Sequence, residues 1–342
     1  MKKCAAFGIL VVFSLCISSE AVFAQRGGRS QGDRINVRLA SPMPSNSDWG
    51  RTLNRIANEW RRVTNDEVRL IIQHDGLEGG EGQVLSSLRS NHIQAALFTS
   101  FGLSQFIPAV MTLSVPFLIS NDAELDLVLQ HILPLLEEQI NRTEFVVIAW
   151  SKGGWVNVFS RDPVFTPDEL RRHRVATSPE SEEVNTTFRT MGFNLIEVDV
   201  PDLATRLSTG AINALYQSPA AVVPNRLHLL MRNMMDMPIA PFIGAVVMNR
   251  VTWNRIGAEN QREILRATRH IAVEFDAAMP RTVDNALREM QRDGLTINRI
   301  NSTQEALWRA DVNRAMPSLL GTTFDPVLYR RISEILTESR GR

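Results

Sequence analysis

The chain of 342 residues carries 37 basic and 37 acidic side chains, and 44% of its residues are hydrophobic. The neutral charge balance gives no support to a nucleic-acid-binding function, and the length and hydrophobic content suffice for two domains with a core each. Both cysteines, Cys4 and Cys16, lie near the N-terminus, so the rest of the chain can form no disulfide and must rely on core burial for its stability.

Residues 1–24 have the features of a secretory signal peptide. Two lysines precede an apolar run over residues 7–15, and Val22-Phe-Ala24 supplies the small residues that signal peptidases accept. We therefore expect a periplasmic protein that begins at Gln25 and has a flexible Gly-, Arg- and Ser-rich leader over residues 25–34.

Two alternatives exist for this N-terminus. A membrane anchor would need about 20 apolar residues, which is longer than the run found here. Lipid attachment at Cys16 would place the bulky Leu15 directly before the modified cysteine, which argues against a lipoprotein. A cleaved signal peptide is therefore the interpretation that the residues favour.

The residues that follow alternate between strands and helices. Residues 93–98 are apolar on both faces, as is typical of a central strand in a parallel sheet. Ser47 can cap a helix whose apolar stripe includes Trp49 and Trp60. This alternation predicts parallel sheets with right-handed crossovers. The predicted elements are strands at 35–39, 68–72 and 93–98, and helices at 47–63 and 83–89.

The pattern restarts after a strand at 145–150 and indicates a second α/β unit. Thr166-Pro-Asp-Glu169 is a helix start with proline in its first turn. A long amphipathic segment over 256–290 predicts a long helix, in which Pro280 should introduce a kink. Further strands are predicted at 174–177, 195–198 and 211–215.

Together these elements predict an α/β fold of two lobes, similar to type II periplasmic binding proteins. Each lobe would hold a mixed, mostly parallel sheet flanked by helices, and hinge strands and the long helix would join the lobes. We expect one lobe at 35–157 and 245–290, and the other at 158–244 and 291–342. Two such lobes behind a secretory signal favour a protein that closes around a small ligand by a hinge.

The loop at residues 216–219 is the first candidate for a binding site. The helix predicted at 202–209 stops at Gly210 and leads into an apolar strand. This order brings Tyr216 and Gln217 to the carboxyl edge of a sheet, where open α/β folds bind their ligands.

Residues 202–219 resemble the segment E-x-x-x-A-L-x-T-G-x-V-D-G-x-E-x-P of the DctP-type substrate-binding proteins of TRAP transporters. Residues 114–122 are similar to the l-P-F-L-F-x-D segment of that family, residues 165–170 to its tPeDLkG segment, and Trp253 stands where the family often has tryptophan. The resemblance extends over most of the chain after the signal. It implies a monomeric binding protein that delivers its ligand to the small and large membrane subunits of a TRAP transporter.

The same resemblance bears on the site. In the family, a strand reading K-I-R-V-P places an arginine in the cleft, where its planar fork binds a substrate carboxylate. In this register, Arg174 stands at the lysine and Ala176 at that arginine. A second arginine of the family falls on Trp155, a cleft glutamate on Thr99, and a loop asparagine on Gln217. The resemblance thus implies a larger, less charged pocket and a small, apolar or weakly polar ligand.

Further ligand-binding candidates complete the predicted site. Trp155 follows Gly153-Gly154 next to the hinge, so hinge packing is the alternative role for its indole. Members without the cleft arginine also resemble a subgroup that works with a periplasmic helical-repeat lipoprotein. Two alternative functions are an organic-acid binder with a non-standard anion site and a ligand-sensing partner of a membrane receptor. The predicted ligand-binding residues are Trp49, Thr99, Ser100, Phe101, Trp155, Ala176, Tyr216, Gln217 and Phe242.

The sequence predicts no enzyme, no catalytic residue, no metal and no cofactor. The six histidines show no spacing typical of metal ligands, and no Gly-x-Ser-x-Gly elbow occurs, although a serine hydrolase with a dispersed triad stays an alternative. The Gly-rich loop at 76–82 resembles a phosphate cradle, but its two glutamates would repel a phosphate and no Gly-Lys-Ser/Thr follows. We interpret it as a loop that opens the helix at 83–89.

Overall fold

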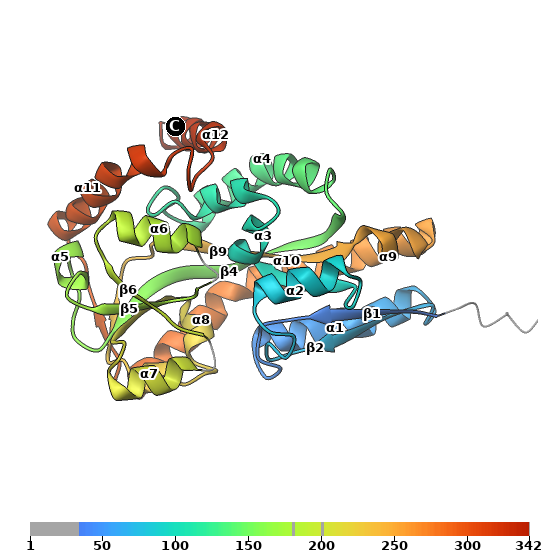
Figure 1. Ribbon diagram of the computed structural model, residues 1–342, viewed down its shortest axis with the longest axis horizontal. Helices are drawn as coiled ribbons and strands as arrows, with labels where there is room; N and C mark the ends of the chain where they lie inside the picture. Colours follow the sequence, from blue (N-terminus) through green and yellow to red (C-terminus); the bar gives the residue numbers. More distant parts are fainter. Residues whose placement is uncertain (1–33, 180–181, 200–201, 342) are drawn as a thin grey trace, which may run out of the picture. The chain divides into compact units, whose positions relative to one another are not determined.

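The computed structural model describes residues 34–179, 182–199 and 202–341. The predicted signal peptide and residues 25–33 of the predicted leader lie outside the described residues. The described residues form a mixed α/β fold in which helices flank the sheet (Figure 1), and this confirms the predicted fold class.

The strands form one continuous path, in the order β2-β1-β3-β9-β4-β7-β5-β6, with β8 and β10 attached beside β4. The pairs β1·β2, β1·β3, β5·β6, β5·β7 and β8·β10 are parallel, whereas β9 and β4 run antiparallel to their neighbours. The strands span Ile35–Ala40 (β1), Val68–Gln73 (β2), Ala95–Thr99 (β3), Phe145–Ser160 (β4), Arg174–Thr177 (β5), Asn194–Glu197 (β6), Ala214–Gln217 (β7), Asn233–Met235 (β8), Ala240–Asn249 (β9) and Thr296–Asn298 (β10).

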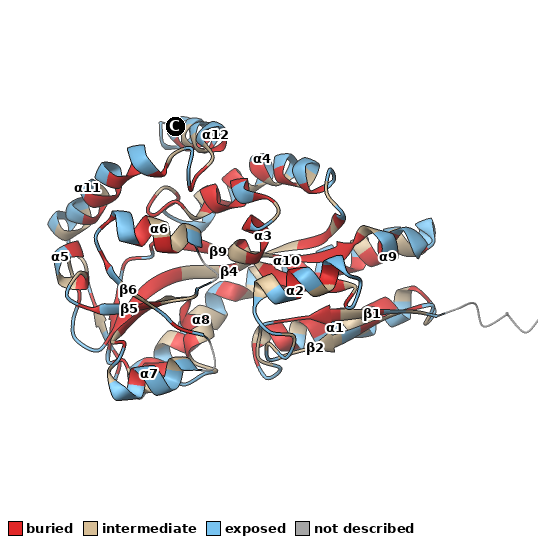
Figure 2. Cartoon of the chain, in the orientation of Figure 1, coloured by how far each residue is buried: buried red, intermediate tan, exposed pale blue. Residues whose placement is uncertain are grey.

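Several helices begin at a residue whose side chain caps them. Ser47 accepts a hydrogen bond from the backbone N–H of Gly50 at the start of α1, and Thr166 and Glu169 form a capping box at α5. Figure 2 shows that the central strands and the inward faces of the helices are mostly buried, whereas the edge strand β6 is not. The helices span Asp48–Val63 (α1), Glu81–Arg89 (α2), Ser100–Ser104 (α3), Asp122–Ile140 (α4), Pro167–Leu170 (α5), Glu182–Thr190 (α6), Leu203–Thr209 (α7), Pro219–Val222 (α8), Arg250–Arg255 (α9), Ala258–Arg292 (α10), Ser302–Leu319 (α11) and Pro326–Arg340 (α12), with 3-10 turns at Pro108–Ser114 (η1) and Leu227–Leu229 (η3).

Two long strands and one long helix connect the β1–β3 side to the β5–β7 side. The first half of β4 pairs with β9, and its last residues pair with β7 and β8. Helix α10 places Ile264 and Ile271 in the core beneath β1 and β2, and places Met290 in the core beside β7. The predicted hinge strands and long helix are therefore present, and α10 continues through Pro280.

The last predicted strand is displaced. It was expected at 211–215 and lies at Ala214–Gln217, so Tyr216 and Gln217 belong to the strand and the loop starts at Ser218. The physical reason is the end of α7. Gly210 adopts a left-handed conformation with φ of 74°, and the N–H of Ile212 still donates to the carbonyl of Arg206 (3.2 Å).

The C-terminal helix lies against α4. Arg340 of α12 pairs with Glu124 of α4 (2.7 Å), and the N–H of Asp325 donates to Thr112 in η1 (3.0 Å). Helix α11 instead contacts α5 and α6, where Arg171 pairs with the buried Asp311. The chain thus returns at its end to elements that the prediction assigns to the first lobe, and the lobe boundaries stay a prediction.

Candidate functional site

A cavity of about 970 Å³ lies at the carboxyl ends of the parallel strands. Its wall includes residues within 40–47 after β1, 75–84 after β2, and 99–101 at the end of β3. The opposite side comes from 176–178 at the end of β5 and 215–217 at the end of β7. Ligands of open α/β sheets bind at this edge, so the cavity is the candidate site.

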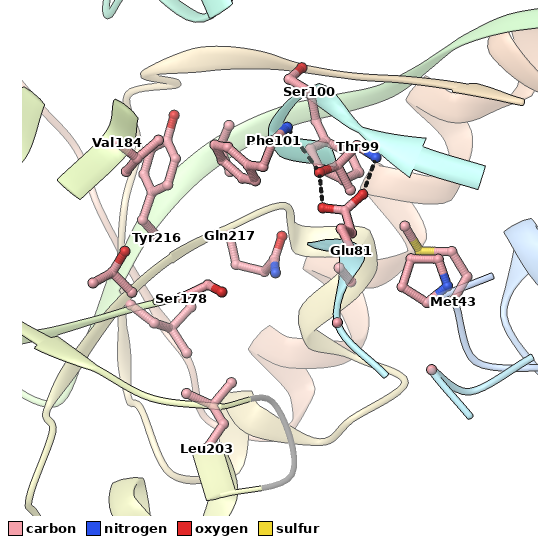
Figure 3. A pocket seen from close by; sticks show the side chains of 18 of the residues that line it. Met43, Glu81, Thr99, Ser100, Phe101, Ser178, Val184, Leu203, Tyr216 and Gln217 are labelled. Carbon is pink, nitrogen blue, oxygen red and sulfur yellow. Dashed lines mark hydrogen bonds between the residues drawn. The ribbon is translucent and has the colours of Figure 1, made fainter. Parts of the chain in front are cut away.

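With one exception, the predicted ligand-binding residues line this cavity, and several of them appear in Figure 3. The exception is Trp155, which is not part of the wall. Whether the lining residues contact a ligand stays a prediction. The residues in the wall are Trp49, Thr99, Ser100, Phe101, Ala176, Tyr216, Gln217 and Phe242.

Hydrogen bonds hold the polar lining residues in place. Thr99 Oγ1 caps α3 by accepting from the N–H of Phe101 (3.2 Å), and Ser100 Oγ donates to the carbonyl of Ile243 (3.1 Å). Gln217 Oε1 accepts from the N–H of Ser218 (2.9 Å). Burial raises the pKa of Tyr216 above its usual value, so its phenol stays neutral at physiological pH.

Glu81 is a residue of the cavity wall that the sequence did not mark as a candidate. It opens α2 directly after the Gly-rich loop, and its carboxylate faces Thr99 (Figure 3). Oε1 accepts from the backbone N–H of Thr99 (2.6 Å) and Oε2 accepts from its hydroxyl (2.7 Å). The loop does open a helix, as predicted. It also lines the cavity, and its Glu81 carboxylate is hydrogen-bonded to Thr99, the residue on which the family's cleft glutamate falls.

The charged side chains of the described wall are all acidic. The lining residues described by the structure include no arginine, lysine or histidine, and their ionisable acids are Asp75, Glu78, Glu81 and Asp199. Ala176 is 8% exposed and lines the cavity at the position implied for the family's arginine. Arg174 lies at the amino end of β5, where it donates to the carbonyls of Ala211 (3.0 Å) and Gly210 (2.5 Å). It is not part of the wall.

The hinge strand β4 depends on two glycines beside the cavity. A Cβ on Gly153 would lie 2.1 Å from the ring of Phe242, and Gly154 has a φ of 85°, which favours glycine. The register with β9 shifts between Lys152 and Trp155. This bulge lets β4 pass close to the ring of Phe242. Beyond it, β4 pairs with β7.

Three side chains of β4 bind the acidic face of α4. Trp155 Nε1 donates to Asp122 (2.7 Å), Lys152 pairs with Asp126, and Trp150 Nε1 donates to Glu137 (3.0 Å). The indole of Trp155 packs against the large core between these elements. The structure thus favours hinge packing, the alternative role that the sequence left open for this residue.

Replacing Trp155 by alanine should lower the thermal stability of the unliganded protein and leave ligand affinity nearly unchanged. The half-buried indole would lose core packing and its bond to Asp122, at a cost of about 2 kcal/mol or more, which corresponds to a fall of several degrees in Tm. Thermal unfolding and calorimetric titration of the variant would measure both quantities. Trp155→Phe is the intermediate variant, because it keeps one aromatic ring against the core but loses the N–H and the five-membered ring of the indole. A loss of affinity with unchanged Tm would place the indole at the ligand instead.

Asp276 of α10 holds the hinge strand from the other side. Its Oδ1 accepts from Ser151 Oγ (3.0 Å) and from the backbone N–H of Lys152 (2.9 Å). Burial raises the pKa of Asp276 to about 6, against the effect of these two hydrogen bonds. The carboxyl group of Asp276 therefore binds its proton more tightly in the folded protein than in the unfolded chain.

The contribution of Asp276 to stability should increase as the pH falls. Because its folded pKa lies above the ordinary value, the charged form opposes folding at pH 7, and protonation between about pH 7 and pH 4 relieves a cost on the order of 2 kcal/mol. In Asp276→Asn the amide oxygen can still accept both hydrogen bonds. In urea unfolding between pH 5 and 7.5, the free energy of unfolding of the variant should therefore rise relative to that of the wild type as the pH rises. Parallel pH profiles of the two proteins would contradict the assignment.

Residues 34–179, 182–199 and 202–341 lack two features, a membrane-spanning helix and a metal-binding cluster. None of the helices there combines the length and the hydropathy that a membrane span requires. The same residues contain no group of three or more His, Cys, Asp or Glu side chains placed to hold a metal ion.

Known proteins resemble this chain over most of its length. Residues 39–320 match the family described as bacterial extracellular solute-binding protein, family 7, or DctP. A curated relative is a solute-binding protein of Sulfitobacter sp. (strain NAS-14.1), 20% identical over 236 residues, which are 68% of this chain and 71% of that protein.

Solved structures show the same fold. A TRAP periplasmic solute-binding protein of Ralstonia eutropha H16 with bound (S)-2-acetolactate has a TM-score of 0.82 at 14% identity, covering 89% of this chain and 99% of that one. A second, from Sulfurospirillum deleyianum with bound succinate, has a TM-score of 0.81 at 14% identity, covering 88% and 99%. Identity this low establishes the fold, and the bound acids belong to those two proteins.

Proposed function

This chain belongs to the DctP family of bacterial extracellular solute-binding proteins, and we propose that it is the solute-binding subunit of a TRAP-type secondary transporter. Its family binds solutes and is not a family of enzymes. The cavity at the carboxyl ends of two sets of parallel strands would hold a small ligand, and β4, β9 and α10 would form the hinge on which the two sides close.

The ligand we propose is small, has a mainly apolar surface and carries no carboxylate. One observation supports this above all: the described wall holds four acids and no basic side chain, with Ala176 at the position implied for the carboxylate-binding arginine. A buried carboxylate requires a charged or hydrogen-bonded partner. Lining side chains such as Val156, Leu215 and Phe242 would instead pack against an apolar body.

We further propose that the protein acts as a monomer in the periplasm after cleavage behind Ala24. Closure around the ligand would present both lobes in the geometry that the membrane subunits recognise, because only the liganded protein favours the closed state. A periplasmic helical-repeat lipoprotein is a second proposed partner, by resemblance to members without the cleft arginine.

An organic acid bound at a non-standard anion site is the alternative. The acids bound to the Ralstonia and Sulfurospirillum proteins favour it. Such a site would have to be built here without a basic side chain from the described wall.

Ligand released from the purified protein tests the proposal. Protein isolated from the periplasm under native conditions would be denatured, and the released small molecules identified by mass spectrometry. We expect a compound without a carboxyl group, in an amount that approaches that of the protein. A stoichiometric carboxylic acid would favour the alternative, and a protein that neither releases nor binds any small molecule would contradict a solute-binding function.

A further inference from the structure

We infer that the ligand of this cavity is an uncharged carbonyl compound with an apolar body, whose carbonyl oxygen accepts a hydrogen bond from the hydroxyl of Tyr216. The inference rests on the proposed solute-binding function and narrows its ligand to one chemical class. It depends on three features of the wall, which are the fixed ring of Tyr216, the hydrogen bonds that other lining hydroxyls already make, and the orientation of the Gln217 amide.

The ring of Tyr216 is held in place near the end of β7, a strand that lies between β4 and β5. Tyr216 pairs with Val158 of β4, and its ring packs edge-to-face on Phe188 of α6, with ring centroids 5.3 Å apart and an interplanar angle of 79°. Phe188 packs in turn against Phe193 (5.5 Å). These neighbours fix the phenol in the wall, and a polar group that is already fixed loses less entropy when a ligand binds.

The hydroxyl of Tyr216 has no hydrogen-bond partner in the part of the chain that the structure describes. Burial raises the pKa of this phenol, so it keeps its proton at physiological pH and can donate it. A desolvated donor without a partner costs free energy, so a ligand atom that accepts from it is favoured. Three other lining hydroxyls already donate to backbone carbonyls at 2.5 to 3.1 Å, and they belong to Ser47, Ser100 and Thr187.

The amide of Gln217 presents a second donor to the cavity. Its Oε1 accepts from the N–H of Ser218 (2.9 Å), and because an N–H can donate only to the amide oxygen, this bond fixes which end of the amide is Nε2. Nε2 has no acceptor among the described residues. Figure 3 shows the amide and the Tyr216 ring extending in different directions, so Gln217 would meet a different atom of the ligand.

Neutral donors in an acidic wall favour a neutral acceptor. A carbonyl oxygen accepts hydrogen bonds and brings no proton that needs an acceptor of its own, whereas a ligand hydroxyl does. A carboxylate also accepts, but the described wall holds four acids and no basic side chain to pair with it. Phe101 and Val184 line the cavity and pack, like Tyr216, against the large core, so they would contact the apolar body.

Four probes that share a phenyl ring and have nearly the same size test the inference. They are acetophenone, 1-phenylethanol, ethylbenzene and benzoate, titrated calorimetrically into ligand-free protein at pH 7. Acetophenone should bind about 10-fold more tightly than ethylbenzene, because one hydrogen bond to a desolvated donor distinguishes the two. The alcohol should lie between them, and benzoate should bind least. Acetophenone that binds no more tightly than any of the other three, or not at all up to its solubility limit, would overturn the inference.

Variants assign the preference to the hydroxyl of Tyr216. Tyr216→Phe removes one oxygen and keeps the ring on Phe188, so acetophenone should bind about 10-fold more weakly and ethylbenzene about as before. Tyr329→Phe makes the same substitution on α12, outside the wall, and should change the affinity of neither probe. Thermal unfolding would verify that both variants are folded. An unchanged preference for acetophenone in folded Tyr216→Phe would contradict the inference.

The inference and the proposed function can fail separately. If the ligand released from native protein lacks an uncharged carbonyl group, the carbonyl inference fails and the solute-binding function stands. If no small molecule is released and no probe binds, the solute-binding function fails as well.

Discussion

Succinate should bind this protein at least about 30-fold, and up to several thousand-fold, more weakly than a DctP protein with a cleft arginine would bind it. Loss of a buried charge-assisted pair with a carboxylate typically costs about 2 to 5 kcal/mol, which gives this range. Here Ala176 stands at the implied arginine position, and the described part of the wall adds four acids. Each succinate carboxylate would enter a cavity whose charge repels it.

Calorimetric titration of succinate into ligand-free protein measures this directly. We expect no saturable heat at micromolar concentrations. The titration should be repeated with the ligand recovered from native protein, which shows that the sample is competent to bind. Succinate binding at micromolar affinity or tighter would refute the argument from the missing arginine and would favour a non-standard anion site.

The order of strands and helices could be predicted because it depends on local patterns. The caps at Ser47 and Thr166, the apolar strand at 95–99 and the amphipathic period of α10 are all properties of neighbouring residues. The start of β7 could not be predicted, because residues 211–213 have strand composition but the N–H of Ile212 still bonds back to Arg206 of α7.

The direction of the Trp155 side chain depends on a feature that the sequence hides. A strand alternates its side chains with a period of two, so counting along β4 gives the correct face only where the pairing is regular. On β9 one residue lies between Ile243 and Pro241, whereas on β4 two residues lie between their partners Lys152 and Trp155. The extra residue at Gly153-Gly154 reverses the alternation, and Trp155 faces α4 instead of the cavity.

Glu81 was missed for a different reason. Its position relative to Thr99 depends on how α2 packs beside α3, which no local pattern encodes. A signal did exist. The loop after β2 must reach the same carboxyl edge as the loops after β3 and β7, and that rule alone would have marked its glutamates as candidates for the cavity.

Substitution of Ala176 by arginine should abolish binding of the native ligand, with a loss of about 100-fold or more. The side chain at this position is nearly buried, beside Val198 and Leu215, and lines the cavity. A guanidinium there would occupy volume in the cavity that a ligand would otherwise fill. Left without a partner, its charge would cost several kcal/mol.

The same variant should acquire weak affinity for succinate, since it restores the fork that binds carboxylates in the family. Ala176→Met separates charge from volume, because it adds a side chain of similar length without a guanidinium. Both variants should lose affinity for the native ligand. In calorimetric titration, only the arginine variant should show a heat of binding with succinate. Thermal unfolding would show whether either variant is misfolded. Native affinity in a folded Ala176→Arg protein would mean that the arginine does not enter the cavity, and the register that places residue 176 at the family's clamp would then be wrong.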